Sequence, residues 1–187
     1  MKKLLTIALA MIMTLAANAQ NDTREPGLYY VDGDNSTPLT HINAITKNTG
    51  TQLLGVIDIG HQKQSYKGLT SDTQCTKAEF VLVIDPSLKG AKMTPKKYNP
   101  FIKTMTPELM ALLPLTLEKK NRAYDEGRTL NGFRMKTNNS IEFEYEQITD
   151  NSWMITAELP AGEYIWAFKV AKHGSFNLAS VFDFTIE

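Results

Sequence analysis

Apolar and polar residues alternate with a period of two along most of this 187-residue chain, and turn residues interrupt the alternation at short intervals. The pattern is typical of short antiparallel strands, because successive side chains of a strand point to opposite faces. The nearly continuous apolar run at residues 79–85 predicts a central strand that is dry on both faces. The expected strands are residues 27–31, 38–42, 51–59, 69–75, 79–85, 115–119, 128–135, 141–149, 153–159, 163–170 and 181–186.

One stretch, residues 86–114, breaks this rhythm and is predicted to be a long crossover. Within it, Thr106 can cap a helix that has Pro107 at its first position and Glu108 near the positive end of the helix dipole. The sequence therefore predicts two helical turns at residues 107–113.

Many short strands, one short helix and no long internal repeat favour a single all-β domain at residues 20–187. The architecture that we expect is an antiparallel β-sandwich, immunoglobulin-like with extra strands. A closed β-barrel of lipocalin type is the alternative. Gly27, Leu28 and Tyr29 stand where that family has a Gly-x-Trp motif.

The first 19 residues have the three parts of a secretory signal peptide. Lys2 and Lys3 precede an apolar run at residues 4–17, and a small-residue cleavage site ends at Ala19. The run is shorter than the roughly 20 apolar residues that span a bilayer, and no Cys stands at the cleavage region for lipid attachment. We therefore expect an exported protein, periplasmic or extracellular, that is neither a lipoprotein nor inserted in the membrane.

Removal of residues 1–19 leaves 168 residues with 18 basic and 20 acidic side chains, a net charge of −2. A charge so near zero gives no electrostatic reason to expect a nucleic acid as partner. Cys75 is the sole cysteine of the chain, so an intrachain disulfide is excluded. We expect Cys75 to be a small buried residue in a strand.

A row of glutamates is the first candidate for chemistry. Glu142, Glu144 and Glu146 share one face of a predicted strand, about 7 Å apart, and the other face carries Ile141, Phe143 and Tyr145. A glycosidase needs two carboxylates across a cleft, one of them in an apolar pocket that raises its pKa. Alternate residues of an exposed strand share water instead, so we interpret the row as a solvated outer face.

Metal and cofactor motifs are missing from the sequence. Asp32, Asp34 and Asn35 are rich in oxygen ligands, but Gly33 stands second in the run, whereas a calcium loop has its Gly at the sixth position. An Asp-Gly pair between strands is typical of a hairpin turn. Ligand spacing is also absent from the three histidines, His41, His61 and His173. We therefore predict no catalytic, cofactor or metal residue.

Lysines gather in the crossover, and two aromatic residues lie among them; the residues are Lys89, Lys92, Lys96, Lys97, Lys103, Tyr98 and Phe101. They are a candidate patch for an acidic polymer, but a solvated rim is the interpretation that we favour, since no Arg lies near them. Trp153 and Trp166 each lie in an alternating strand. We expect both in the core and not on a carbohydrate-binding surface.

The segment LPAGEY at residues 159–164 is similar to the turn that enters the penultimate strand of immunoglobulin-like and fibronectin-like sandwiches. In those families a Tyr hydroxyl bonds back to the backbone of the turn, and the resemblance gives that role to Tyr164, with Leu159, Pro160 and Gly162 forming the turn. Ala161 and the single residue between Gly162 and Tyr164 are departures from the pattern. The resemblance also implies that the position of Glu163 tolerates many residues.

The mature chain also resembles a group of uncharacterised secreted proteins of Bacteroidetes. The similarity rests on GLYY at residues 27–30, YKGLTS at 66–71, KKNRAY at 119–124 and the closing LPAGEY and VFDFTI segments. This resemblance implies fold and export and carries no known activity.

Three hypotheses about function remain open. The first is a non-enzymatic binding or structural module of the cell envelope or surface, with an unknown protein or glycan partner contacted by loops that include the crossover. The second is a carbohydrate-active hydrolase whose carboxylates are brought together only by the fold. The third is a barrel that carries a small apolar ligand.

Overall fold

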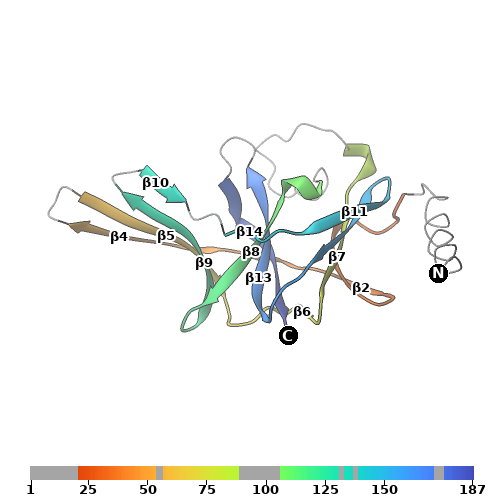
Figure 1. The fold of residues 1–187 in the computed structure, drawn as a ribbon, viewed down its shortest axis with the longest axis horizontal. Helices are drawn as coiled ribbons and strands as arrows, with labels where there is room; N and C mark the ends of the chain where they lie inside the picture. Colours follow the sequence, from red (N-terminus) through yellow and green to blue (C-terminus); the bar gives the residue numbers. More distant parts are fainter. Residues whose placement is uncertain (1–20, 54–56, 89–105, 131–132, 137–138, 171–174) are drawn as a thin grey trace, which may run out of the picture.

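The computed structural model describes residues 21–53, 57–88, 106–130, 133–136, 139–170 and 175–187, and in these ranges the protein is all-β and mainly antiparallel (Figure 1). The predicted all-β class is confirmed. A five-stranded sheet has the order β11 (Glu144–Thr149), β12 (Ser152–Ala157), β7 (Ala78–Val83), β1 (Gly27–Asp32) and β2 (Asn35–Pro38). A larger sheet has the order β3 (His41–Asn43), β14 (Ser175–Ile186), β13 (Gly162–Val170), β8 (Met110–Leu117), β9 (Asn121–Leu130), β5 (Ile57–Lys67) and β4 (Ile45–Leu53), with β10 (Phe133–Lys136) on β9 and β6 (Gln74–Cys75) on β14.

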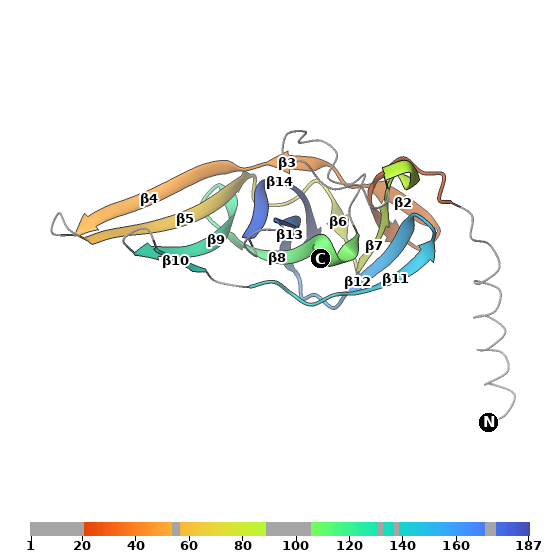
Figure 2. The same cartoon turned by 90° about the horizontal axis from the view of Figure 1, so that it is seen from above.

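The larger sheet curls into a small barrel, because its two ends belong to one continuous stretch of chain. β3 pairs with β14 at one end, β4 pairs with β5 at the other, and only Ala44 separates β3 from β4. Ala44 N donates to Ala179 O at 3.0 Å, and Tyr66 Oη of β5 reaches across to donate to Leu178 O of β14 at 2.9 Å. Figure 2 shows this ring, with β3 and β8 on opposite sides.

The five-stranded sheet covers one side of the barrel. The fold therefore has two sheets packed face to face, as in a sandwich, and one of these sheets curls into a barrel. β4 and β5 extend away from the ring on the side opposite β7 and β11 (Figures 1 and 2). β8, β13 and β14 of the barrel face the covering sheet on one side and the barrel interior on the other, so they are shared by two cores.

Two apolar cores lie on the two faces of these shared strands. Leu112 of β8 and Trp166 of β13 belong to the core between the sheets, whereas their neighbours Leu113 and Ile165 belong to the core inside the barrel. All four side chains are fully buried, and burial of each apolar side chain contributes about 1.5–3 kcal/mol. Because successive side chains of a strand point to opposite faces, β8 and β13 each contribute apolar side chains to both cores.

Several strand predictions are confirmed. β7 is the central strand of its sheet, and Val81 and Val83 on its outer face are as buried as Phe80 and Leu82 on its inner face. β1 and β2 form the expected hairpin, in which Asp32 pairs with Asn35 and Gly33 has a φ of 59°.

The predicted helix at residues 107–113 is wrong. Only Pro107–Leu109 forms a short 3-10 turn (η2), Thr106 makes no side-chain capping bond, and β8 starts at Met110. The local capping signals are present, but residues 110–113 are buried on both faces and pair with β13, so tertiary packing overrides them. Of the strand predicted at residues 115–119, residues 115–117 are the end of β8, and residues 118–119 lie in the turn before β9.

Two predicted single strands are hairpins in the structure. Residues 51–59 include the end of β4 and the start of β5, with Leu53 paired to Ile57. Residues 128–135 include the end of β9 and most of β10, with Leu130 paired to Phe133. The Asn-Gly pair at residues 131–132 is a sequence typical of hairpin turns. The prediction missed it because the alternation of apolar and polar residues continues on both sides of the pair.

Three other predicted strands have different bounds. Residues 38–42 are divided between β2 and β3, because the chain passes from the smaller sheet to the larger one at Leu39, whose N–H donates to Leu28 O at 2.8 Å. Residues 69–75 contain only β6. Residues 141–143 precede β11, and Ile141 forms an isolated bridge with Leu112.

Two tyrosines each donate a hydrogen bond from the side-chain hydroxyl to the backbone carbonyl of the residue four positions earlier, in the turn before a strand. Tyr164 Oη donates to Pro160 O at 2.8 Å, as in the turn that LPAGEY resembles, and Tyr29 Oη donates to Glu25 O at 2.6 Å. Each ring lies against a glycine two residues earlier, where an added Cβ would come within 3.3 Å or less of the ring or its hydroxyl. The first strand of the smaller sheet and the penultimate strand of the chain therefore begin at similar corners.

Tyr164→Phe is expected to lower the free energy of unfolding by about 1–3 kcal/mol, because the partly buried hydrogen bond to Pro160 O is lost. Tyr29→Phe is the matched control and should cost less, because its bond is exposed and water replaces the hydroxyl. Urea unfolding of both variants measures the difference. Equal losses, or no loss for Tyr164→Phe, would contradict the role of this corner.

Candidate functional site

Glu163 belongs to a buried ion cluster with Arg122 and Asp183. Arg122 of β9 donates from Nη1 to Glu163 Oε2 at 3.0 Å, and the same nitrogen forms an ion pair with Asp183 Oδ2 of β14 at 2.6 Å. A second guanidinium nitrogen donates to Lys67 O at 3.3 Å. The three charged side chains are only 3–6% exposed, so the implied tolerance of position 163 is wrong.

The ion cluster closes one end of the barrel. Strand alternation places Arg122, Glu163 and Asp183 on the same faces as Tyr124, Ile165 and Val181, which fill the barrel. The loop before β6 is tied onto the cluster by hydrogen bonds: Thr185 Oγ1 donates to Glu163 Oε1 at 2.8 Å, Ser71 N donates to Thr185 Oγ1 at 3.1 Å, and Ser71 Oγ donates to Asp183 O at 3.1 Å. Both carboxylates have charged partners within the protein, which favours a structural role.

A groove of about 1180 Å³ opens where the two sheets meet at their ends. It lies beside the start of β7, β8 and β11 and the end of β12 and β14. Its lining residues are Thr76, Lys77, Ala78, Glu79, Pro107, Glu108, Met110, Ala111, Ser140, Ile141, Glu142, Phe143, Glu144, Tyr145, Thr156, Ala157, Glu158, Leu159 and Ile186.

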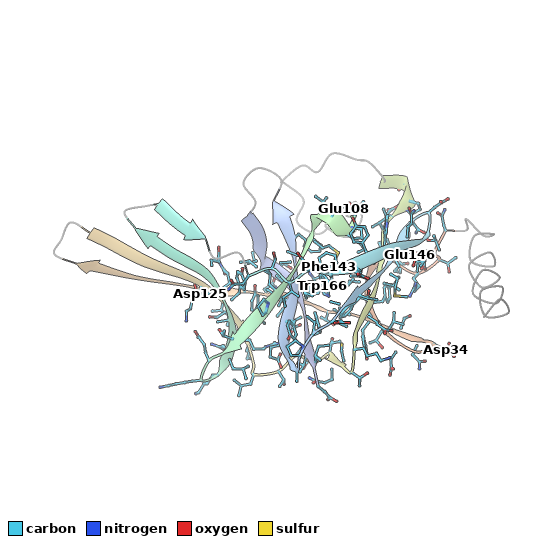
Figure 3. All side chains as sticks on the ribbon, viewed as in Figure 1. Asp34, Glu108, Asp125, Phe143, Glu146 and Trp166 are labelled. Carbon is cyan, nitrogen blue, oxygen red and sulfur yellow. The ribbon has the colours of Figure 1, made fainter. Side chains whose placement is uncertain are left out.

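The inner wall of the groove is apolar. Ile141, Phe143, Ala157 and Leu159 are partly buried and pack against the core between the sheets. Phe143 meets Trp166 edge to face, with ring centroids 5.0 Å apart (Figure 3). The inner wall is therefore continuous with the core and fixed in position by it.

The rim of the groove is acidic. Glu108, Glu142, Glu144 and Glu158 are exposed, and the side chain of Glu79 is 41% exposed. Lys77 is the one cation among the described lining residues and lies 3.9 Å from Glu79. Tyr145 Oη donates to Glu108 Oε1 at 3.1 Å, which raises the pKa of the Tyr145 hydroxyl.

The interpretation of the predicted glutamate row as a solvated face is confirmed, because Glu142, Glu144 and Glu146 are all exposed. Ile141 and Phe143 point to the core as expected, whereas Tyr145 is 44% exposed at the rim of the groove. The sequence does not predict that Glu79, Glu108 and Glu158 line the same groove as Glu142 and Glu144. These residues lie in separate strands and turns, and only the fold brings them together.

The other candidates are placed apart from the groove or outside the described residues. Asp32 and Asp34 are exposed at the β1–β2 turn, and His41 packs on Phe182 with ring centroids 3.8 Å apart. Burial lowers the pKa of His41. Among the described residues no group of three or more His, Cys, Asp or Glu side chains can hold a metal. The side chains of His61 and His173, the lysine patch of the crossover and the signal peptide lie outside what the structure describes.

The expectations for the tryptophans and the cysteine are confirmed. Trp153 and Trp166 are 7% and 0% exposed and belong to the core between the sheets. Cys75 lies in β6, is 1% exposed and is a free thiol. Burial raises the pKa of the Cys75 thiol to about 12.

Comparisons with protein-family models, with curated proteins and with solved structures give no match for this chain. The part of the chain that the structure describes contains no helix long and apolar enough to span a membrane. The class that the fold defines is therefore an all-β protein in which a small barrel is covered by a second sheet, with an acidic groove at their junction.

Arg122→Met should lower the free energy of unfolding by about 3–5 kcal/mol, because it leaves two buried carboxylates without their cation. Replacing all three groups, as in Arg122→Met with Glu163→Gln and Asp183→Asn, should cost less than the single change. Lys63→Met is the control, since it breaks a half-exposed pair with Glu118 at 2.9 Å and should cost under about 1 kcal/mol. Chemical unfolding compares the variants, and equal costs for Arg122→Met and Lys63→Met would refute a structural role of the cluster.

Cys75 should resist alkylation by iodoacetamide at pH 8 in the folded protein. Its raised pKa leaves very little thiolate at that pH, and burial blocks access to the sulfur. The modification rate is measured by mass spectrometry and compared with that of urea-unfolded protein. Similar rates in the two states would show that the thiol is accessible.

Proposed function

We propose that this protein is an exported binding module of the cell envelope or surface that acts without catalysis, and that it holds a protein or glycan partner in the groove. The observation that carries the proposal is the groove itself, which combines an apolar inner wall with a polar rim at the junction of the two sheets. The groove is open to solvent and has a volume of about 1180 Å³, which is enough to hold part of a polymeric ligand.

A hydrolase is the second candidate, because five carboxylates surround the groove. Hydrolysis of a glycosidic bond needs one protonated carboxyl near neutral pH, and burial in an apolar pocket is the usual means of raising its pKa. All five groove glutamates are exposed or half-exposed. The arrangement therefore supports binding better than acid catalysis.

A carrier of a small apolar ligand is less well supported. The described interior of the barrel is filled by side chains, among them Tyr66, Leu113, Tyr124 and Ile165. The ion cluster of Arg122 closes one end. The groove lies outside the barrel and is open to solvent.

Export and family membership form part of the same proposal. The signal-peptide pattern supports export, and the tyrosine corner together with the short motifs supports a relation to immunoglobulin-like secreted proteins of Bacteroidetes. N-terminal sequencing of protein from cell fractions checks export: a chain that starts at Gln20 in the periplasm or medium is expected, and an intact Met1 in the cytoplasm would contradict it.

Thr156→Trp is expected to weaken binding at least tenfold, because Thr156 lines the groove and the larger side chain obstructs it. Glycan and peptide arrays first identify ligands of residues 20–187, and titration then compares the variants. Thr37→Trp on the exposed strand β2 is the matched control and should leave affinity unchanged. Equal affinity of Thr156→Trp and the unaltered protein would place the binding site elsewhere.

A further inference from the structure

We propose that the occupant of the groove is an extended basic segment of a partner protein, one that carries several lysine or arginine side chains and at least one apolar side chain. This inference rests on the proposed function and deepens it by naming the class of ligand. It assigns one part of the ligand to the acidic rim and another part to the apolar inner wall.

Charge is the first argument. Among the residues that the structure describes, five glutamates and one lysine line the groove, which gives these six a net charge of −4 when all are ionised, in a chain whose overall formal charge is zero. Lys77 has Glu79 as a neighbour at 3.9 Å, and Glu108 accepts a hydrogen bond from Tyr145. The other rim glutamates, which are exposed and can face a ligand's cations, are Glu142, Glu144 and Glu158. Complementary potentials attract a basic partner and repel phosphate polymers and acidic glycans.

The apolar inner wall is the second argument. Ile141, Phe143 and Leu159 offer a contact surface that an inorganic cation or a polyamine cannot use, and hydrophobic contact adds affinity that salt does not screen. A peptide presents both kinds of group in alternation, because successive side chains of an extended chain point in opposite directions.

The edge of the smaller sheet is the third argument. β11 is the last strand in its sheet, pairs with β12 on one side, and has Glu144 and Tyr145 in the groove. An extended peptide can hydrogen bond to the backbone of such an edge. Charged residues on an edge strand also serve to prevent unwanted pairing, so the experiment has to separate recruitment of a basic chain from simple protection of the edge.

Three synthetic peptides of about ten residues, capped at both ends, test the inference. In the first, lysine alternates with valine; in the second, serine replaces valine; in the third, glutamate replaces lysine. Fluorescence anisotropy should show saturable binding of the first peptide, binding about tenfold weaker for the second and none for the third.

Glu142→Gln combined with Glu144→Gln should weaken binding of the first peptide about fivefold or more, because each exposed ion pair contributes a modest amount. Asp32→Asn combined with Asp34→Asn is the matched control: it changes the net charge equally at the β1–β2 turn, which lies apart from the groove (Figure 3). This control should change affinity less than twofold. Thermal unfolding confirms that both variants are folded.

Each outcome decides between the proposals. Equal weakening in the two variants would show non-specific attraction and overturn the basic-peptide inference. If no lysine peptide binds but an array ligand is lost in Thr156→Trp, the inference fails and the binding module stands. If no ligand depends on Thr156, both fail. Selective loss in the groove variant, with the expected order of the three peptides, supports both.

Discussion

Burial of β8 and β13 on both faces is the constraint on which the rest of the structure depends. Residues that face one way need the five-stranded sheet as a cover, and residues that face the other way need the barrel to close around them. A sheet with two apolar faces is stable only when both are covered. The barrel and the covering sheet therefore depend on each other, and the groove arises where they part at the strand ends.

Burial also gives one residue type two different roles. Glu163 is almost fully enclosed, and it is retained because Arg122 and Thr185 supply bonds to its oxygens. Glu142 and Glu144 are exposed to solvent at the rim of the groove. The distinction is one of surroundings, since both kinds of glutamate occur in or beside strands.

Much of the fold could be predicted from the sequence, because period-two alternation and turn residues are local signals. The helix prediction failed at residues 107–113, where local capping signals competed with packing on two faces. The role of Glu163 was missed because Arg122 lies 41 residues away in the chain. The groove needed the fold, since Glu79, Glu108 and Glu158 share no sequence pattern with Glu142 and Glu144.

The closure of the barrel has a consequence for folding kinetics. β14, the final strand in chain order, holds β3 from the first quarter of the sequence, and the His41–Ser180 contact spans 139 residues. Contacts of such long range require the loop-closure entropy to be overcome before they contribute any stability. The ring can therefore form only after the whole chain is present, and folding is expected to be slow and cooperative, with partly synthesised chains remaining open.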